Sequence, residues 1–341
     1  MVWSKLFAFM SKDLAMDLGT ANTLLYMPKG GIVLNEPSVV ALSSRDNKVL
    51  AVGQEAKEFL GRTPKSITAV RPMKDGVIAD FEVTKVMISY FIRKVIKGFN
   101  LIKPRMVICV PTGITPVEKR AVIESGLQAG AREVLLIEEP MAAAIGAGLP
   151  IEEPLGNMVV DIGGGTTEVA VISLSAVAYS ESVRVAGDEM NDSIQRYVQN
   201  KYQMLIGENM AETLKKKVGA ALPLKDSLTC RLSGKYLVNG SPKSVEISDR
   251  EVSEAIREPV NATVSAVGRA LDKTPPELIS DILDQGVLLA GGGALLKGLD
   301  QLIAKKLQLK VVVDQEPLTT VVRGTGITLN NMKKFSEVYI N

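Results

Sequence analysis

The chain lacks histidine entirely, although it has 341 residues. This absence excludes Ser-His-Asp triads, Cys-His dyads, histidine-ligated zinc and histidine general bases. Any catalysis must therefore depend on carboxylates, hydroxyls, lysines, backbone amides and a cation that prefers oxygen ligands, such as Mg²⁺.

Cysteine is almost as scarce, and long apolar runs are missing. Cys109 and Cys230 lie far apart and form no CxxC motif, which predicts a reducing compartment and two buried thiols. No apolar run approaches the roughly 18 residues of a membrane-spanning helix. The N-terminus is too short and too interrupted for the apolar core of a secretory signal.

An excess of either charge is missing as well. Lysine and arginine number 40 against 38 acidic residues, for a net charge of +2. This balance argues against a nucleic-acid partner, because such binders are usually markedly basic. Hydrophobic residues make up 46% and charged residues 23%, near the average for folded proteins. At roughly 100–200 residues per domain, the length predicts about two domains.

The first twelve residues, MVWSKLFAFMSK, have an amphipathic pattern. A helical wheel separates lysines and serines from an apolar side that holds three of the fifteen aromatics of the chain. Such a helix can lie in the interface of a bilayer. A helix packed on its own domain, or a disordered end, fits the same pattern. The apolar side consists of Val2, Trp3, Leu6, Phe7, Phe9 and Met10.

Strand and helix patterns alternate along the chain, which predicts α/β domains. Residues 14–27 read as strand, turn and strand, and residues 105–110 as a strand. A helix is then expected with Thr115 as its N-cap, Pro116 in its first position and Glu118 completing a capping box.

The remaining pattern has the same α/β character. Residues 33–75 and 184–249 resemble insertions into two larger units. In the first half, a strand is expected at 133–137 and an alanine-rich helix after Pro140. The second half is expected to begin with a strand–turn–strand around Asp161, followed by helices near 190–205 and 208–221 and a polar β-segment around 228–247. A helix over about 250–272, a helix start at "TPPELISDIL", and a strand, glycine turn and helix from "GVLLAGGG" onward complete the pattern.

One internal repeat is visible. The segments AMDLGTANTLLYM (15–27) and VVDIGGGTTEVAVI (159–172) share the order apolar strand, Asp, apolar residue, Gly, turn and second strand. Asp17 and Asp161 occupy the same place in the two segments. A duplicated α/β domain is the simplest explanation.

The two turns match neither of the common phosphate loops. A Walker A loop needs Gly-Lys-Ser/Thr before a helix, and a dinucleotide fingerprint also opens a helix, whereas strands follow both turns here. Either turn alone fits a structural hairpin. As a pair, they fit a phosphate clamp, because glycines let the backbone approach a phosphate and the neighbouring polar side chains can bind it. The polar side chains are those of Thr20, Asn22, Thr166 and Thr167.

Acidic residues accompany these turns. Asp17 and Asp161 end strands beside the expected phosphates, where their charge would be repulsive without a cation, so the pair implies Mg²⁺. Glu139, held before Pro140, could order or polarise an attacking water, or could simply begin a helix. A third turn, Gly291–Gly293, leads into a helix. It fits a nucleotide-binding site or an ordinary connection between a strand and a helix of an α/β domain.

Together these segments resemble the actin–chaperone–sugar-kinase ATPase superfamily. More closely, they resemble the MreB family of bacterial actin homologues, over nearly the whole chain. The segments that carry the resemblance are DLGTANTLLY, VLNEPSVVA, RPMKDGVIADF, IEEPMAAAIG, VVDIGGGTTEVAVIS, AGDEMNDSI and TPPELISDI.

The resemblance implies an actin-like ATPase fold: two duplicated, ribonuclease-H-like α/β domains with ATP and Mg²⁺ in the cleft between them. Each domain carries a smaller subdomain. The implied boundaries are 1–32 and 76–147 for subdomain IA, with an amphipathic segment at 1–11; 33–75 for IB; 148–183 and 250–341 for IIA; and 184–249 for IIB.

The resemblance also assigns site residues. Glu139 matches the residue that positions the hydrolytic water, with Thr166 as its helper, and Asp17 and Asp161 match the metal-side carboxylates. Glu212 and Lys215, in an E-x-x-K element, would face the adenosine. The implied phosphate contacts are Thr20, Ala21, Asn22, Gly163, Gly164, Gly165 and Thr166, and the implied adenine-side turn is Gly291, Gly292, Gly293 and Ala294.

In function, the resemblance implies ATP hydrolysis to ADP coupled to antiparallel double filaments of this chain. These filaments would lie in the cytoplasm on the inner face of the membrane and organise cell-wall elongation together with membrane proteins. The amphipathic N-terminus matches the family's membrane anchor, and Leu101 and Ile102 match a second inserting loop.

Three related classes remain as alternatives. A chaperone ATPase needs a substrate domain after "RGTGITLNNM", where few residues follow. A sugar kinase needs an acidic base facing a sugar site. An actin-like division anchor usually carries its membrane helix at the C-terminus, where MKKFSEVYIN is only weakly amphipathic.

Overall fold

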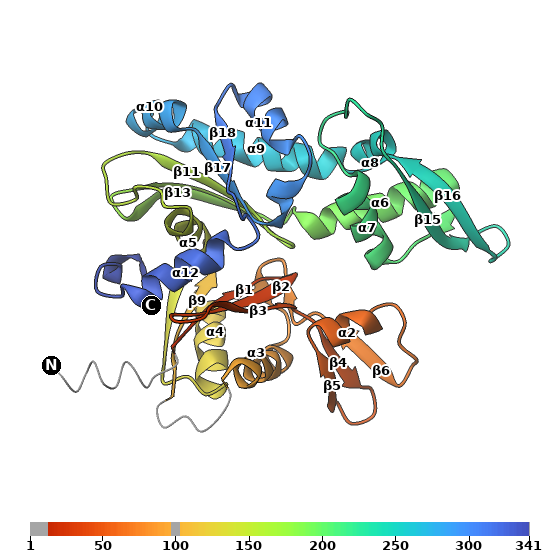
Figure 1. Ribbon diagram of the computed structural model, residues 1–341, viewed down its shortest axis with the longest axis horizontal. Helices are drawn as coiled ribbons and strands as arrows, with labels where there is room; N and C mark the ends of the chain where they lie inside the picture. Colours follow the sequence, from red (N-terminus) through yellow and green to blue (C-terminus); the bar gives the residue numbers. More distant parts are fainter. Residues whose placement is uncertain (1–12, 97–102, 341) are drawn as a thin grey trace.

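The computed structural model describes residues 13–96 and 103–340 (Figure 1). Two five-stranded sheets dominate it, and they have the same strand order. The first runs β10-β9-β1-β2-β3 and the second β18-β17-β11-β12-β13. In each, the central strand pairs antiparallel with a hairpin partner on one side and parallel with a later strand on the other. The predicted duplication is thus confirmed at the level of topology.

The strands of the first sheet are β1 (Leu14–Leu18), β2 (Asn22–Met27), β3 (Gly31–Pro37), β9 (Arg105–Val110) and β10 (Glu133–Glu138). Those of the second are β11 (Asn157–Ile162), β12 (Thr167–Ser173), β13 (Ala176–Val183), β17 (Val287–Ala290) and β18 (Val311–Val313). Every residue of β11 is buried, as expected for a central strand that is covered on both faces.

Helices cover the outer face of each sheet. On the first sheet, Leu14 and Met16 point into a core with α3 (Phe81–Val95) and α4 (Pro116–Gln128). The α4 start has the predicted Thr115–Glu118 capping box. On the second sheet, the outer core includes side chains of α9 (Arg257–Lys273), α10 (Pro276–Gln285) and α11 (Leu299–Leu307).

Two helices lie between the sheets, and each crosses to the other half. Helix α5 (Glu139–Gly146) follows β10 in the chain but also packs on β11 and β12 of the second sheet. Helix α12 (Thr320–Asn330) comes late in the chain but packs on β1, β2 and β9 of the first sheet. Their backbones are in direct contact, because a Cβ on Gly324 would lie 1.8 Å from the carbonyl oxygen of Ala142. A glycine is therefore required at this crossing.

Two smaller units extend to the same side of the molecule (Figure 1). The first contains β4 (Val40–Ser43), β5 (Val49–Val52), β6 (Ile67–Val70) and α2 (Gln54–Phe59). The second contains α6 (Gly187–Tyr202), β14 (Met204–Leu205), α7 (Glu208–Val218), β15 (Thr229–Tyr236), β16 (Pro242–Ser248) and α8 (Asp249–Ala255).

Short elements complete the fold: β7 (Met73–Lys74), β8 (Val77–Ile78) and the 3₁₀ helices η1 (Gly292–Leu295) and η2 (Ser336–Val338). Strand β3 belongs to the first large sheet, so that sheet continues beyond residue 32, where the sequence places the start of the smaller unit. None of the helices in the described ranges is long and apolar enough to cross a membrane.

Several sequence-based expectations were wrong in detail. The alanine-rich helix begins at Glu139 and not after Pro140, because proline is compatible with the first turn of a helix. The helix expected at 250–272 is two helices, which meet at Ile256. The helix expected to reach residue 221 ends at Val218 before Gly219. Cys230 is only partly buried, because it lies in a hairpin with one exposed face, whereas Cys109 is buried as expected.

Candidate functional site

A cavity of about 590 Å³ opens between the two halves. Every predicted site residue in the described ranges lines it, with the exception of Ala294 and Thr167. The Thr167 hydroxyl donates to the Val185 carbonyl oxygen at 2.7 Å instead. Both halves contribute residues, the second half more than the first. These are Asp17, Thr20, Ala21, Asn22 and Glu139 from the first half, and Asp161, Gly163, Gly164, Gly165, Thr166, Glu212, Lys215, Gly291, Gly292 and Gly293 from the second.

The two repeated hairpins face each other across this cavity at close range. A Cβ on Gly164 would lie 2.7 Å from the Cβ of Ala21, and one on Gly165 would lie 2.8 Å from Thr20 Oγ1. The second turn is tight, since the Gly163 amide donates to the Thr166 carbonyl oxygen at 2.9 Å. Glycines at this point keep the turns bare, so main-chain atoms of both hairpins border the same space.

Strand register places the two aspartates symmetrically. Asp17 in β1 lies beside Cys109 in β9, and Asp161 in β11 lies beside Ala290 in β17. Burial raises the pKa of Asp17 to about 6 and, together with the negative charge of Asp17, raises that of Asp161 to about 7. The Oδ1 atom of Asp161 is buried without a hydrogen-bond partner.

These carboxylates fit a hard divalent cation. Carboxylate oxygens are preferred ligands of Mg²⁺, and two acidic groups with raised pKa values around one cavity need positive charge to be ionised together. The unpartnered oxygen of Asp161 is an acceptor that a cation, or water bound to one, would satisfy.

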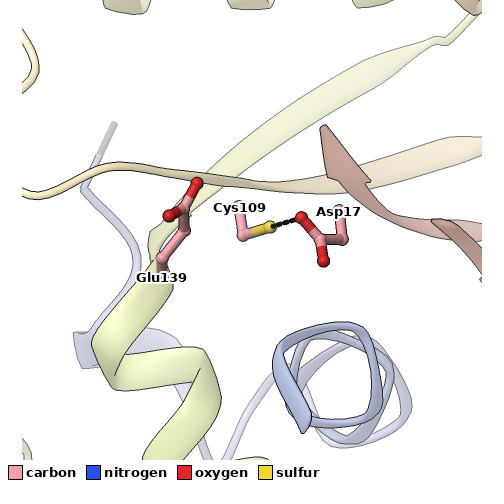
Figure 2. A group of neighbouring side chains, drawn as sticks. All are labelled: Asp17, Cys109 and Glu139. Carbon is pink, nitrogen blue, oxygen red and sulfur yellow. Dashed lines mark hydrogen bonds between the residues drawn. The ribbon is translucent and has the colours of Figure 1, made fainter. Parts of the chain in front are cut away.

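Glu139 is the first residue of α5, at the end of β10. Burial is the main cause that raises the pKa of its carboxyl group well above the usual range, and the charges of Glu168, Asp161 and Asp17 add to the shift. Figure 2 shows Glu139 on one side of Cys109 and Asp17 on the other. The carboxylate is thus close to the metal-side residues and belongs to a rigid helix start.

One wall of the cavity is formed by α7. Glu212 and Lys215 lie one turn apart on this helix, and Lys215 Nζ donates to the Gly187 carbonyl oxygen at 2.6 Å. Burial lowers the pKa of Lys215 to about 8. Burial alone would raise the pKa of Glu212, but the hydrogen bonds from Lys216 and Lys57 have the larger combined effect and lower this pKa to about 2.

The third glycine turn closes the cavity behind Asp161. Gly291 has φ +78°, and a Cβ there would lie 2.4 Å from Asp161 Oδ1. The turn leads into a helix as expected, the short 3₁₀ helix η1, and α11 begins further on, at Leu299. Ala294 is buried in the core of the second half and does not line the cavity, because its side chain points away in η1.

Sequence reasoning missed the charged residues that connect the smaller units. Arg71 forms ion pairs with Asp188, at 3.3 Å, and with Glu208. Lys57 pairs with Glu212 at 3.0 Å. We call these three contacts the interlobe ion pairs. Asp188 lies within AGDEMNDSI and Arg71 begins RPMKDGVIADF. Both segments contribute to the family resemblance, but the sequence alone predicts no contact for these two side chains.

Glu168 was also missed. Its carboxylate accepts from the Thr112 amide at 3.2 Å and from the Ser182 hydroxyl at 2.6 Å, so it connects the second hairpin to the loop after β9 of the first half. Burial raises its pKa to about 7. In the sequence, only its position after the glycine turn, in the segment Thr166–Glu168, indicates that Glu168 lies near the site.

The candidate membrane residues lie outside the described residues. They are Trp3, Leu6, Phe7, Phe9, Met10, Leu101 and Ile102.

Two sheets of identical strand order, with opposed Asp-Gly hairpins around one central cavity, define the actin-like ATPase fold. Comparison with known proteins narrows this class. The chain belongs to the MreB/Mbl family, whose pattern ("MreB/Mbl protein") it matches over residues 11–337.

Relatives agree with this assignment. The chain is 50% identical over 325 residues to the cell shape-determining protein Mbl of Bacillus subtilis (strain 168), covering 95% of this chain and 97% of the relative. It is 53% identical over 324 residues to the cell shape-determining protein MreB of Escherichia coli (strain K12), covering 94% and 93%. Crystal structures of MreB5 of Spiroplasma citri bound to ADP and to AMPPNP match with a TM-score of 0.91 and 34% identity, over 96% of this chain and 98% of MreB5.

Proposed function

We propose that this chain is an Mg²⁺-dependent ATPase of the cell-shape machinery that couples ATP hydrolysis to self-assembly. One observation carries the proposal: both Asp-Gly hairpins face one cavity, with Asp17 and Asp161 at corresponding strand ends. The neighbours that bind ADP and AMPPNP support ATP and ADP as ligands.

The phosphates would lie between the two hairpins, where bare glycine turns and the hydroxyls of Thr20 and Thr166 can donate hydrogen bonds. Thr20 Oγ1 already accepts from the Gly76 amide at 3.0 Å, which orients the hydroxyl. Asp17 and Asp161 would hold Mg²⁺, directly or through water. When bound, this ion would supply positive charge against the phosphate oxygens.

Glu139 would align the attacking water and accept its proton. The raised pKa makes its carboxylate a stronger base than that of an exposed glutamate. Thr166, buried in the second hairpin, would help to orient the same water. On the adenosine side, Glu212 and Lys215 would contact the nucleoside, while Gly291, Gly292 and Gly293 leave room for it, with Ala294 buried behind them.

The relatives named as cell shape-determining support a role in shape. We propose that the protein forms paired, antiparallel protofilaments at the inner face of the cytoplasmic membrane and contacts membrane proteins of the elongation machinery. Trp3, Phe7 and Phe9, with Leu6 and Met10, would enter the lipid interface, as would Leu101 and Ile102. We also propose that the chain divides into subdomains IA, IB, IIA and IIB at the boundaries that the family resemblance implies.

The water-positioning role is tested by Glu139→Ala. ATP hydrolysis should slow strongly while ATP affinity stays close to wild type, because the residue aligns water and not the nucleotide. The measurements are single-turnover hydrolysis and equilibrium binding of a fluorescent nucleotide. Equal losses of binding and turnover would show that Glu139 has another role.

The membrane role is tested by changing Trp3 and Phe7 to serine. Each buried large apolar side chain contributes about 1.5–3 kcal/mol, so vesicle co-sedimentation should fall sharply. Unchanged co-sedimentation would move the anchoring role to Leu101 and Ile102.

A combined pelleting assay with ATP and liposomes separates the classes of function. Filaments and vesicle binding support the proposal. Hydrolysis stimulated by a sugar, without filaments or vesicle binding, would favour a sugar kinase instead.

A further inference from the structure

Three potential metal ligands from three different elements meet beside the cavity, which two of them, Asp17 and Glu139, line, while Cys109 is buried next to them. They are Asp17 at the end of β1, Cys109 in β9 and Glu139 at the start of α5 (Figure 2). One oxygen of each carboxylate and the Cys109 sulfur all lie within 4.8 Å of one another. The sulfur is central in this group, and the proposed reaction gives it no role.

The distance between two of these ligands matches that of a thiolate metal site. The Cys109 thiol donates a hydrogen bond to Asp17 Oδ1 at 3.4 Å, and a metal ion bound by both atoms would replace this proton. With metal–sulfur and metal–oxygen distances of about 2.3 and 2.0 Å, tetrahedral geometry places the two ligand atoms about 3.5 Å apart. The arrangement results from parallel pairing, because Asp17 and Cys109 are register partners in β1 and β9.

Glu139 can supply the third ligand. Within the described residues, no hydrogen bond or ion pair holds its carboxylate, so side-chain rotation can bring an oxygen closer to the other two. A fourth carboxylate oxygen, Asp161 Oδ1, is buried without a partner in a residue that lines the same cavity. It provides an additional acceptor that a cation would satisfy.

We propose that Asp17, Cys109 and Glu139 bind a thiophilic divalent cation, of the Zn²⁺ or Co²⁺ type, when no nucleotide occupies the cavity. On binding, the Cys109 S–H bond breaks, a sulfur–metal bond forms and the proton leaves to solvent. Three protein ligands then leave one position open for water. Mg²⁺ gains little from a thiolate, because it prefers six oxygen ligands, so the sulfur selects the softer ion.

This site rests on the proposed function in one respect, because Asp17 would serve both cations. A thiophilic ion would bind the Asp17 carboxylate, so that Mg²⁺ could not. It would also bind Glu139, which could then no longer contact the attacking water. Such an ion would therefore inhibit hydrolysis and would compete with Mg²⁺–nucleotide.

Cobalt is a suitable probe, because a Co²⁺–thiolate bond absorbs in the near ultraviolet. The full chain, freed of nucleotide and treated with a chelator, is titrated with Co²⁺. We expect one equivalent to produce the thiolate band, and Zn²⁺ or Mg²⁺–ADP to abolish it. Cys230→Ser is the matched control, since it removes the only other thiol, and it should retain the band.

Cys109→Ala should lose the band and bind Co²⁺ at least about tenfold more weakly, an effect that even outer-shell partners of metal sites can reach. Glu139→Gln keeps both cysteines and should also weaken binding, which tests the site if Cys109→Ala folds poorly. A band that persists in Cys109→Ala, disappears in Cys230→Ser, or is unaffected by Glu139→Gln would overturn the site. Absence of any band in the wild-type protein would do so as well.

The titration contains no ATP, so failure of the ATPase proposal leaves its result valid. Conversely, normal Mg²⁺–ATP hydrolysis without a Co²⁺ band would refute only this site.

Discussion

The interlobe ion pairs should control how fast nucleotide leaves the cavity. Arg71, Lys57, Asp188 and Glu212 line the cavity, and their partners lie on opposite small units. We expect release of the proposed nucleotide to require these units to separate, so each pair that must break should add to the barrier. Arg71→Ala removes two of the three contacts at once.

The size of the effect follows from burial. The Arg71 side chain is 24% exposed, and those of Asp188 and Glu208 are 35% and 38% exposed. At an effective dielectric constant of about 20, each pair gains roughly 4 kcal/mol of Coulomb energy, most of which desolvation and side-chain entropy offset. Exposed pairs retain about 0.2–1 kcal/mol, so two partly exposed pairs should together contribute about 1–2 kcal/mol. Nucleotide release should accelerate about 5- to 30-fold.

The assay is stopped-flow dissociation of a fluorescent ADP chased with excess ATP. Arg120→Ala is the matched control, because Arg120 forms its ion pair with Glu124 inside one helix. Glu208→Gln is the second variant. Glu208 is not among the residues that line the cavity, so its effect must come through Arg71. Higher salt should accelerate release from the wild-type protein more than from Arg71→Ala.

A release rate for Arg71→Ala within about twofold of the Arg120→Ala control would refute the reasoning, since surface substitutions alone change energies by that amount. An effect of Arg71→Ala without any effect of Glu208→Gln would mean that Arg71 acts through its pair with Asp188 or through direct contact with the nucleotide.

Two further predictions concern stability. Gly324→Ala places a Cβ 1.8 Å from a helix carbonyl oxygen and should lower the free energy of unfolding by about 1–3 kcal/mol or more. Gly268→Ala within α9 meets only Leu307 at 3.7 Å and should raise it by about 0.5–1 kcal/mol. Urea unfolding measures both, and equal effects of the two would contradict the close contact between α5 and α12. The second prediction concerns pH. Asp17 and Asp161 have pKa values raised from 3.8 to about 6 and about 7, so the folded state binds more protons than the unfolded state between about pH 4 and 7. Stability of the nucleotide-free protein in chelator should therefore fall as pH rises through this window. Asp161→Asn should flatten the fall, and a stability that rises with pH in both proteins would contradict the assignment.

The parts that the sequence predicted correctly depend on local patterns. Hairpins around Gly19 and Gly164, and the capping box at Thr115, involve residues only a few positions apart. The internal repeat then connected the two hairpins, because similar segments adopt similar folds. The absence of histidine then left carboxylates as the main candidates for catalysis, and those beside the two hairpins were few.

Contacts between distant residues could not be predicted in the same way. Arg71 and Glu208 are 137 positions apart, and nothing in either neighbourhood identifies the partner. The break at Ile256, by contrast, had a local signal that was overlooked, because Pro259 lies in the first turn of α9 and cannot donate to the carbonyl oxygen of Ala255 at the end of α8. The burial of Ala294 in the core could not be predicted either, because it depends on a short 3₁₀ turn that composition alone does not specify.

The exchange of α5 and α12 between the halves has a consequence for biosynthesis. The inner face of the first sheet includes Ala15 and Val107, which are covered in part by Val321 and Leu329 of α12. Because α12 spans Thr320–Asn330, its share of this apolar face stays uncovered until the ribosome has released those residues. Domains usually fold in order as they emerge, but here the first sheet receives part of its cover from a helix far along the second half. Val321 of this helix also lines the cavity, so an incomplete nascent chain cannot complete the cavity.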